Sequence, residues 1–156
     1  CDIDSISRET SVQYDDVQIR AIKKAIKSQV MVLTGGPGTG KTTTTQGIIA
    51  ALKGMRLNVL LAAPTGRAAK RMSEATGMEA KTIHRMLELG YNGDEARDSM
   101  YYGRNEDNPL EADVIIVDEC HSWYSVCVSL TPYVFRLWFY TTFSTEYTNS
   151  TVKYTK

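Results

Sequence analysis

The sequence lacks any apolar run long enough to span a bilayer, and it has no signal-peptide pattern. It has only three cysteines, Cys1, Cys120 and Cys127, which form no C-x-x-C pair and leave one thiol over in any disulfide scheme. This usage argues against a structural zinc site and favours a reducing compartment. We therefore predict a cytoplasmic protein without a membrane partner.

An excess of either charge sign is also absent, because 18 Lys and Arg residues balance 18 Asp and Glu residues. The overall charge therefore neither favours nor excludes a nucleic-acid partner, which would depend on local clusters. The length of 156 residues suits one domain with a real core. The first residue is Cys1 and not methionine, which predicts a fragment, a processed product or a trimmed chain.

A glycine-rich segment, TGGPGTGKTTTT, follows an apolar run at residues 30–33 and fills the P-loop pattern G-x-x-x-x-G-K-[ST]. The glycines let backbone N–H groups turn toward phosphate oxygens, and a helix that begins near Lys41 adds the positive end of its dipole. Lys41 is expected to reach the β- and γ-phosphates, and Thr42 to ligate Mg²⁺. The alternative, a glycine-rich turn before a helix, is disfavoured by the complete pattern. The predicted nucleotide-binding residues here are Gly35, Gly36, Pro37, Gly38, Thr39, Gly40, Lys41, Thr42 and Thr43.

Apolar periodicity predicts alternating helices and strands around this loop. Continuous apolar runs predict strands that are buried on both faces, at 30–33, 58–62 and 114–117. Helical spacing and terminal residues predict helices over 15–27, 41–53 with Gly54 as the stop, 67–76 with Gly77 as the stop, and 82–89 with Thr82 as the cap. Residues 1–13 show no period, and residues 90–109 are expected to form a loop with a hairpin near Tyr101 and Tyr102. The pattern predicts an α/β P-loop fold, a parallel sheet with helices on both faces.

The third apolar run ends on Asp118 and Glu119, in the form of a Walker B element. The first acid of such a pair holds Mg²⁺, and the second can activate the water that attacks the γ-phosphate. We predict Asp118 as a metal ligand with Thr42, and Glu119 as the general base. Strands also often end in acids at a solvated rim, and it is the preceding P-loop that favours the functional interpretation.

Two weaker features have structural alternatives. The amide of Gln18 could pair with the edge of adenine, although a lone glutamine on a helix is more simply a surface residue. Residues 67–85 carry five basic residues against two acidic ones, and they could bind a phosphate backbone or form a solvated helical face. His84 taken alone is more often a packed or surface histidine than a functional one.

The composition changes after Glu119. Residues 120–156 contain ten of the fourteen aromatic residues but only four of the thirty-six charged ones. Three explanations stay open for this atypical, aromatic-rich tail: a different structural element, a disordered end, or a sequence translated in the wrong frame. We therefore divide the chain into a lead-in at 1–13, a partial ATPase domain at 14–119 and the tail at 120–156.

Four blocks in order, TGGPGTGKTTT, LAAPTGRAAKRMSEATG, AKTIHRML and RNEDNPLEADVIIVDE, closely resemble the RecD-like helicases of superfamily 1B. This group includes the exodeoxyribonuclease V alpha subunit. The resemblance covers about residues 14–119 and implies an incomplete RecA-like motor domain with ATP and Mg²⁺ as cofactors, in which Lys41 and Glu119 are catalytic. Gln18 resembles the family's adenine-reading glutamine. The single-stranded DNA contacts that the resemblance implies are Pro64, Thr65, Gly66, Arg67, Thr82 and His84.

The resemblance also implies movement 5′ to 3′ on single-stranded DNA and possible subunits of a helicase/nuclease complex as partners. The chain departs from the family after Glu119, and the later motifs and the second motor domain have no counterpart in it. We therefore expect the ATP-binding part of a DNA helicase that does not unwind DNA as this fragment. Two alternatives stay open: a nucleotide-binding fragment without turnover, and a P-loop ATPase that does not act on DNA.

Overall fold

A computed structural model of the chain describes residues 3–28, 30–35, 38–91, 100–105, 107–118 and 139–144. The helices are α1 (Ile3–Thr10), α2 (Asp16–Lys27), α3 (Lys41–Gly54), α4 (Gly66–Thr76) and α5 (Ile83–Met86). The strands are β1 (Val30–Gly35), β2 (Val59–Ala63), β3 (Ala80–Thr82), β4 (Leu89–Tyr91), β5 (Met100–Tyr102), β6 (Val114–Asp118) and β7 (Phe139–Ser144). None of these helices is long and apolar enough to cross a membrane.

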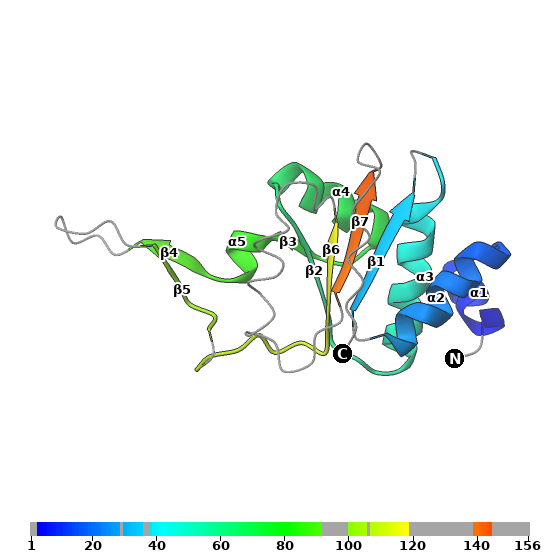
Figure 1. Cartoon of the computed structure of the whole chain (residues 1–156), viewed down its shortest axis with the longest axis horizontal. Coiled ribbons are helices and arrows are strands. Elements are labelled where there is room, and N and C mark those ends of the chain that lie inside the picture. Colours follow the sequence, from blue (N-terminus) through cyan, green and yellow to red (C-terminus); the bar gives the residue numbers. More distant parts are fainter. Residues whose placement is uncertain are drawn as a thin grey trace.

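Five of the strands form one parallel sheet in the order β1-β7-β6-β2-β3 (Figure 1). The three strands that the apolar runs predict are β1, β2 and β6, and the predicted α/β class with a parallel sheet is confirmed. β3 has only three residues, too few to show a period. β7 lies in the aromatic-rich tail, between β1 and β6, where no sequence pattern predicts a strand.

Both faces of the central strands are buried, as their continuous apolar sequences require. Side chains alternate between the two faces of a strand. In β6, Val114 and Ile116 join the core under α1, α2 and α3, whereas Ile115 and Val117 join a second core with α5. Both cores therefore anchor β6, and this fixes where its last residue, Asp118, leaves the sheet.

The helix ends follow the predicted signals at most positions. Asp15 begins α2 with a capping box, and Gly77 ends α4 in the left-handed conformation at φ 67°. α3 runs one residue further than predicted: Gly54 is its last helical residue, and the left-handed residue is Arg56. The predicted stop at Gly54 is therefore wrong, and Met55 is the C-cap.

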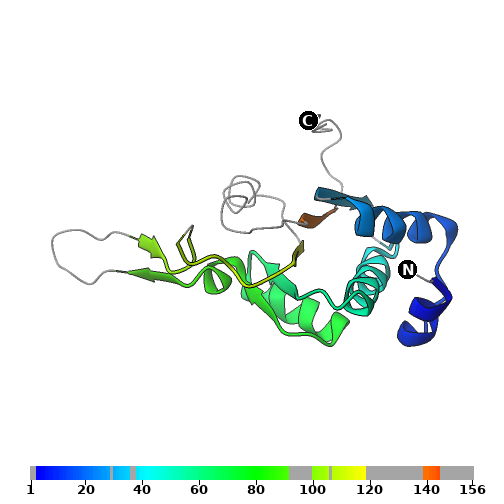
Figure 2. The same ribbon diagram turned by 90° about the horizontal axis from the view of Figure 1, so that it is seen from below.

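Two segments differ more strongly from the sequence expectations. Residues 1–13, which show no period, contain α1, an eight-residue helix held mainly by the buried side chain of Ile6. The helix expected over 82–89 is capped by Thr82 but ends at Met86, because the chain turns into β4. β4 pairs antiparallel with β5, so the hairpin predicted near Tyr101 and Tyr102 is present, and it projects from the sheet (Figure 2).

Candidate nucleotide-binding site

The glycine-rich loop connects the carboxyl end of β1 to the first turn of α3. Gly38 and Gly40 both have positive φ, 75° and 72°, a conformation that L side chains rarely adopt. Gly38 has no atom within 4 Å of the place where a Cβ would stand, so the backbone is open to a close approach there. Gly36 and Pro37 lie outside the described residues.

The two ends of the loop lie close together. A Cβ on Gly35 would be 2.6 Å from Thr39 Oγ1, so a side chain at this position would collide with the returning loop. The Lys41 ammonium donates a hydrogen bond to the carbonyl of Gly35, which holds its charge against the loop. These contacts place a cation and bare backbone beside each other, a combination that suits a phosphate chain.

The amino terminus of α3 differs from those of α2, α4 and α5. Asp15, Thr65 and Thr82 cap those helices with side-chain oxygens, whereas Gly40 caps α3 without a side-chain bond, and the first turn of α3 carries no acidic residue. The positive end of the α3 dipole therefore meets no carboxylate of its own helix turn, and a bound anion is stabilised at such a terminus. The described part of the loop fits the phosphates of a nucleotide.

The threonines that follow Lys41 divide into two pairs. Thr44 and Thr45 are buried, and Thr44 Oγ1 donates to the carbonyl of Gly40 at 3.0 Å. Thr42 is exposed and Thr43 half-buried, so the hydroxyl predicted to ligate Mg²⁺ is accessible. The unusual run of threonines thus combines two residues that pack α3 with two beside the loop.

Asp118 lies at the same edge of the sheet as the loop. It is the last residue of β6, in register with Thr142 of β7, whose other neighbour, β1, ends at Gly35. The separation is two strand spacings, roughly 10 Å across the sheet. Asp118 therefore lies on the loop side of the sheet, and a carboxylate with a hydroxyl such as that of Thr42 is a pair of ligands that suits a hard cation such as Mg²⁺. Glu119 lies outside the described residues.

Gln18, which is predicted to read the base, lies against Gly40 at the end of the loop. Its Oε1 accepts from the Asp15 amide at 3.1 Å, so its carbonyl end belongs to the capping box of α2. Its Nε2 is 2.6 Å from where a Cβ on Gly40 would stand. The amide donor of Gln18 therefore lies beside the phosphate loop, and the positive φ of 72° favours glycine at position 40.

The predicted DNA-facing residues gather at the ends of β2 and β3, two neighbouring parallel strands in which Ala63 is in register with Thr82. Thr65 and Thr82 each accept a backbone hydrogen bond as helix caps, from Ala68 and Arg85 respectively, both at 3.2 Å. Each hydroxyl keeps a proton that it can donate to another group. Pro64 is half-buried, Gly66 and Arg67 are exposed, and His84 is half-buried.

The basic residues of this segment are all exposed: Arg67, Lys70, Arg71, Lys81 and Arg85. One acid, Glu74, lies 3.9 Å from Lys70, a solvent-exposed pair that is worth little. Positive charge is therefore exposed along α4 and at β3 and α5. The structural interpretation of Thr65 and Thr82 as helix caps is confirmed, and their contact with DNA stays a prediction.

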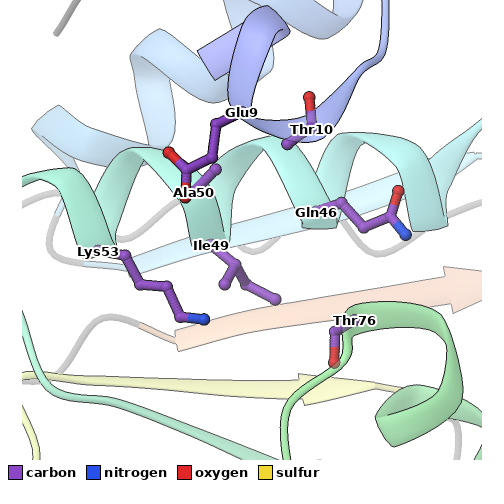
Figure 3. A pocket seen from close by; sticks show the side chains of 7 residues that line it. All are labelled: Glu9, Thr10, Gln46, Ile49, Ala50, Lys53 and Thr76. Carbon is purple, nitrogen blue, oxygen red and sulfur yellow. The ribbon is translucent and has the colours of Figure 1, made fainter. Parts of the chain in front are cut away.

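A separate pocket lies between α1, α3 and α4 and is shown in Figure 3. Its lining residues are Glu9, Thr10, Gln46, Ile49, Ala50, Lys53 and Thr76. Gln46 Nε2 donates to the carbonyl of Ala75 there, which ties α3 to the end of α4. The lining includes no described residue of the glycine-rich loop, so this pocket is distinct from the predicted nucleotide site.

The model of a family described as an AAA domain matches residues 18–135, from Gln18 past Asp118 and into the tail. The chain belongs to this AAA-domain family. Membership implies nucleotide binding, and the matched range contains the whole loop and the strand that ends in Asp118.

The relatives of this AAA-domain chain include a RecD2 DNA helicase and RecD subunits of the RecBCD enzyme. It is 44% identical over 115 residues to the ATP-dependent RecD2 DNA helicase of Deinococcus radiodurans, which covers 74% of this chain and 15% of the relative. It is 35% identical to the RecBCD enzyme subunit RecD of Haemophilus influenzae, in an alignment that covers 67% of this chain and 19% of the relative. It is also 35% identical to the RecBCD enzyme subunit RecD of Mycolicibacterium smegmatis, in an alignment that covers 75% of this chain and 24% of the relative. The resemblance to RecD-like helicases is therefore confirmed, and the chain spans less than a quarter of the length of these relatives.

Proposed function

We propose that this chain is the ATP-binding part of an ATP-dependent 5′–3′ DNA helicase of the RecD-like type. One observation carries the proposal: the left-handed Gly38 and Gly40, the α3 terminus without a side-chain cap, and Asp118 all lie at one edge of a parallel sheet. Ligands of such sheets bind at the carboxyl ends of the strands. The proposal is also supported by the similarity to proteins named ATP-dependent RecD2 DNA helicase and RecBCD enzyme subunit RecD.

In this proposal the loop backbone from Gly36 to Gly40 surrounds the phosphates, and Lys41 neutralises charge on the β- and γ-phosphates. Mg²⁺, held by Thr42 and Asp118, would stabilise the charge that develops on those phosphates during transfer. Glu119 would take a proton from the attacking water, and the Gln18 amide would select adenine. Single-stranded DNA would follow the strand ends from Pro64 to Arg67 and from Thr82 to His84, and other subunits of a helicase/nuclease complex are candidate partners.

A second candidate is a nucleotide-binding fragment without turnover. It is favoured by the chain's length, because the chain corresponds to only 15% of the RecD2 relative. A single-turnover hydrolysis assay with excess chain over ATP separates the two, since the fragment would bind ATP without cleaving it. A third candidate, an ATPase that does not act on DNA, predicts hydrolysis that single-stranded DNA does not stimulate.

Nucleotide binding at the loop is tested by Lys41→Ala. Removal of a charged hydrogen-bond donor to phosphate is expected to weaken Mg·ATP binding about 10- to 100-fold. Lys53→Ala is the matched control, because Lys53 is exposed in the last turn of the same helix and far from the loop. Calorimetric titration that gives equal affinities for the Lys41 variant and the unchanged chain would rule out this site.

A phosphate-backbone contact at the strand ends predicts DNA binding that is weak and falls steeply with salt. Fluorescence anisotropy with a labelled single-stranded oligonucleotide should show the affinity decreasing from low to moderate salt. Arg67→Ala is expected to reduce the salt slope by about one unit, whereas Lys23→Ala, an exposed cation on α2, should leave it unchanged. Binding that is insensitive to salt would contradict this contact.

A further inference from the structure

Gly47 lies in the middle of α3, where glycine is the least favourable residue after proline on helix propensity alone. A Cβ at this position would be 2.6 Å from Ile22 Cδ1 and 2.9 Å from Tyr14 Cζ, distances at which carbon atoms overlap. Gly47 is buried, and so are Ile22 and Tyr14. The side chains of α2 and of the segment before it therefore rest directly on the α3 backbone.

The same helix face carries the phosphate loop. Gly40, Thr44, Gly47 and Ala51 follow each other at intervals of four, three and four residues, which places them along one side of α3. On α2, Gln18 and Ile22 are four residues apart and occupy one side in the same way. The close approach at Gly47 and the close approach of Gln18 to Gly40 are therefore two points of a single helix–helix contact.

Tyr14 is held in place from behind by α1. Its hydroxyl donates to Thr10 Oγ1 at 2.8 Å, and Thr10 Oγ1 donates to the carbonyl of Ile6, also at 2.8 Å. Ile6 is itself buried against the core under α3. Because its hydroxyl is tied to α1 in this way, the Tyr14 ring has little freedom to yield to a larger residue at position 47.

We infer that Gly47 is a positioning residue for base selectivity, because it allows α2 to lie close enough to α3 for Gln18 to reach the nucleotide. The inference rests on the proposed function, in which Gln18 recognises adenine. A methyl group at position 47 pushes α2 away from α3 and takes Gln18 with it. The phosphate contacts are unaffected, since the loop and Lys41 are carried by α3 itself.

The test is Gly47→Ala in the full chain, with affinities measured by calorimetry for Mg·ATP, Mg·GTP and Mg·tripolyphosphate, which has no base. The preference for ATP over GTP is expected to fall at least fivefold, while tripolyphosphate affinity stays within about twofold of the unchanged chain. Gly54→Ala is the matched control: it makes the same substitution in the same helix, at a position with no atom within 4 Å of the new methyl group. Gly54→Ala should change neither the preference for ATP over GTP nor the affinity for tripolyphosphate.

Two further variants keep the test decisive. Gln18→Ala should lose the ATP preference to the same extent as Gly47→Ala. Ile22→Val removes the Cδ1 atom that the new methyl group meets, so Ile22→Val combined with Gly47→Ala should recover part of the preference. If Gly47→Ala alone does not fold, as judged by circular dichroism, the combined variant is compared with Ile22→Val alone. A lower preference for ATP over GTP in the combined variant than in Ile22→Val then supports the inference, and an equal preference contradicts it.

The possible failures are distinguishable. A folded Gly47→Ala chain with an unchanged ATP preference, beside a Gln18→Ala chain that has lost it, overturns the inference and leaves the proposed function standing. Equal loss of ATP and tripolyphosphate binding also overturns it, because the methyl group would then have disturbed the loop and not the base. An unchanged chain that binds no Mg·ATP overturns both.

Discussion

Glu119→Gln is expected to retain Mg·ATP and to lose hydrolysis by about 10²- to 10⁴-fold, the range that a positioned general base contributes. The amide keeps the size of the side chain and can still hydrogen-bond to water, but it cannot accept a proton at neutral pH. In the sequence the residue directly follows Asp118, the last residue of β6. Binding and turnover should therefore separate cleanly in this variant.

The measurement requires a motor that turns over, so the substitution is made at the matching acid of a full-length RecD-like relative, with ATP affinity and single-turnover hydrolysis measured together. The control in the same motor is the position that matches Glu111, which precedes the amino end of β6 and is exposed. A glutamine there should leave both quantities unchanged. Unchanged hydrolysis in the variant at the Glu119 position would show that the role assigned to that acid is wrong.

The glycine-rich loop and the three buried strands could be predicted because each depends on local sequence. Gly38 and Gly40 need φ values that few other residues adopt, and a pattern that requires glycine at fixed positions is visible without a structure. The strand ending in Asp118 is an uninterrupted apolar run because both of its faces are covered. In these cases the structural requirement restricts the residue type, so it can be read from the sequence alone.

Other features depend on contacts between segments that are distant in the sequence. The sequence pattern does not predict α1, because one buried isoleucine, Ile6, gives no measurable period. β7 lies among aromatic residues with no turn signals around it, and its place is defined only by pairing with β1 and β6. Gly47 gives a usable signal, since an interior glycine costs a helix about 0.5–1 kcal/mol relative to alanine and needs a reason. That reason, the approach of Ile22 and Tyr14, appears only in the folded chain.

In the candidate site, too, some features depend on local sequence and others on contacts between distant segments. The sequence predicts ligand contacts for Gln18, Thr65 and Thr82, and in the structure all three side chains also take part in helix capping. A capping box has its own sequence signature, an aspartate followed three residues later by glutamine, so the structural role of Gln18 could have been predicted as well. Only its proximity to Gly40 distinguishes it from an ordinary capping glutamine.

The 156-residue chain is expected not to separate DNA strands, even with saturating ATP. A superfamily 1 motor closes two RecA-like domains on ATP, and the second domain supplies arginines to the γ-phosphate, a role worth about 10³–10⁵ in rate in related phosphoryl-transfer enzymes. The only arginine after Asp118 is Arg136, which lies in the aromatic-rich tail without a helicase motif around it. Translocation also requires one domain to move against another.

The check is a strand-separation assay on a duplex with a 5′ single-stranded overhang, with a full-length RecD-like helicase as the positive control. Arg136→Ala provides an internal comparison, because it should leave any residual hydrolysis unchanged if this arginine does not face the γ-phosphate. Robust unwinding by the chain alone would overturn the expectation. A loss of hydrolysis of about 10³-fold or more in the Arg136 variant would also overturn it. Arg136 would then act on the γ-phosphate in the role that an arginine of a second motor domain is expected to have.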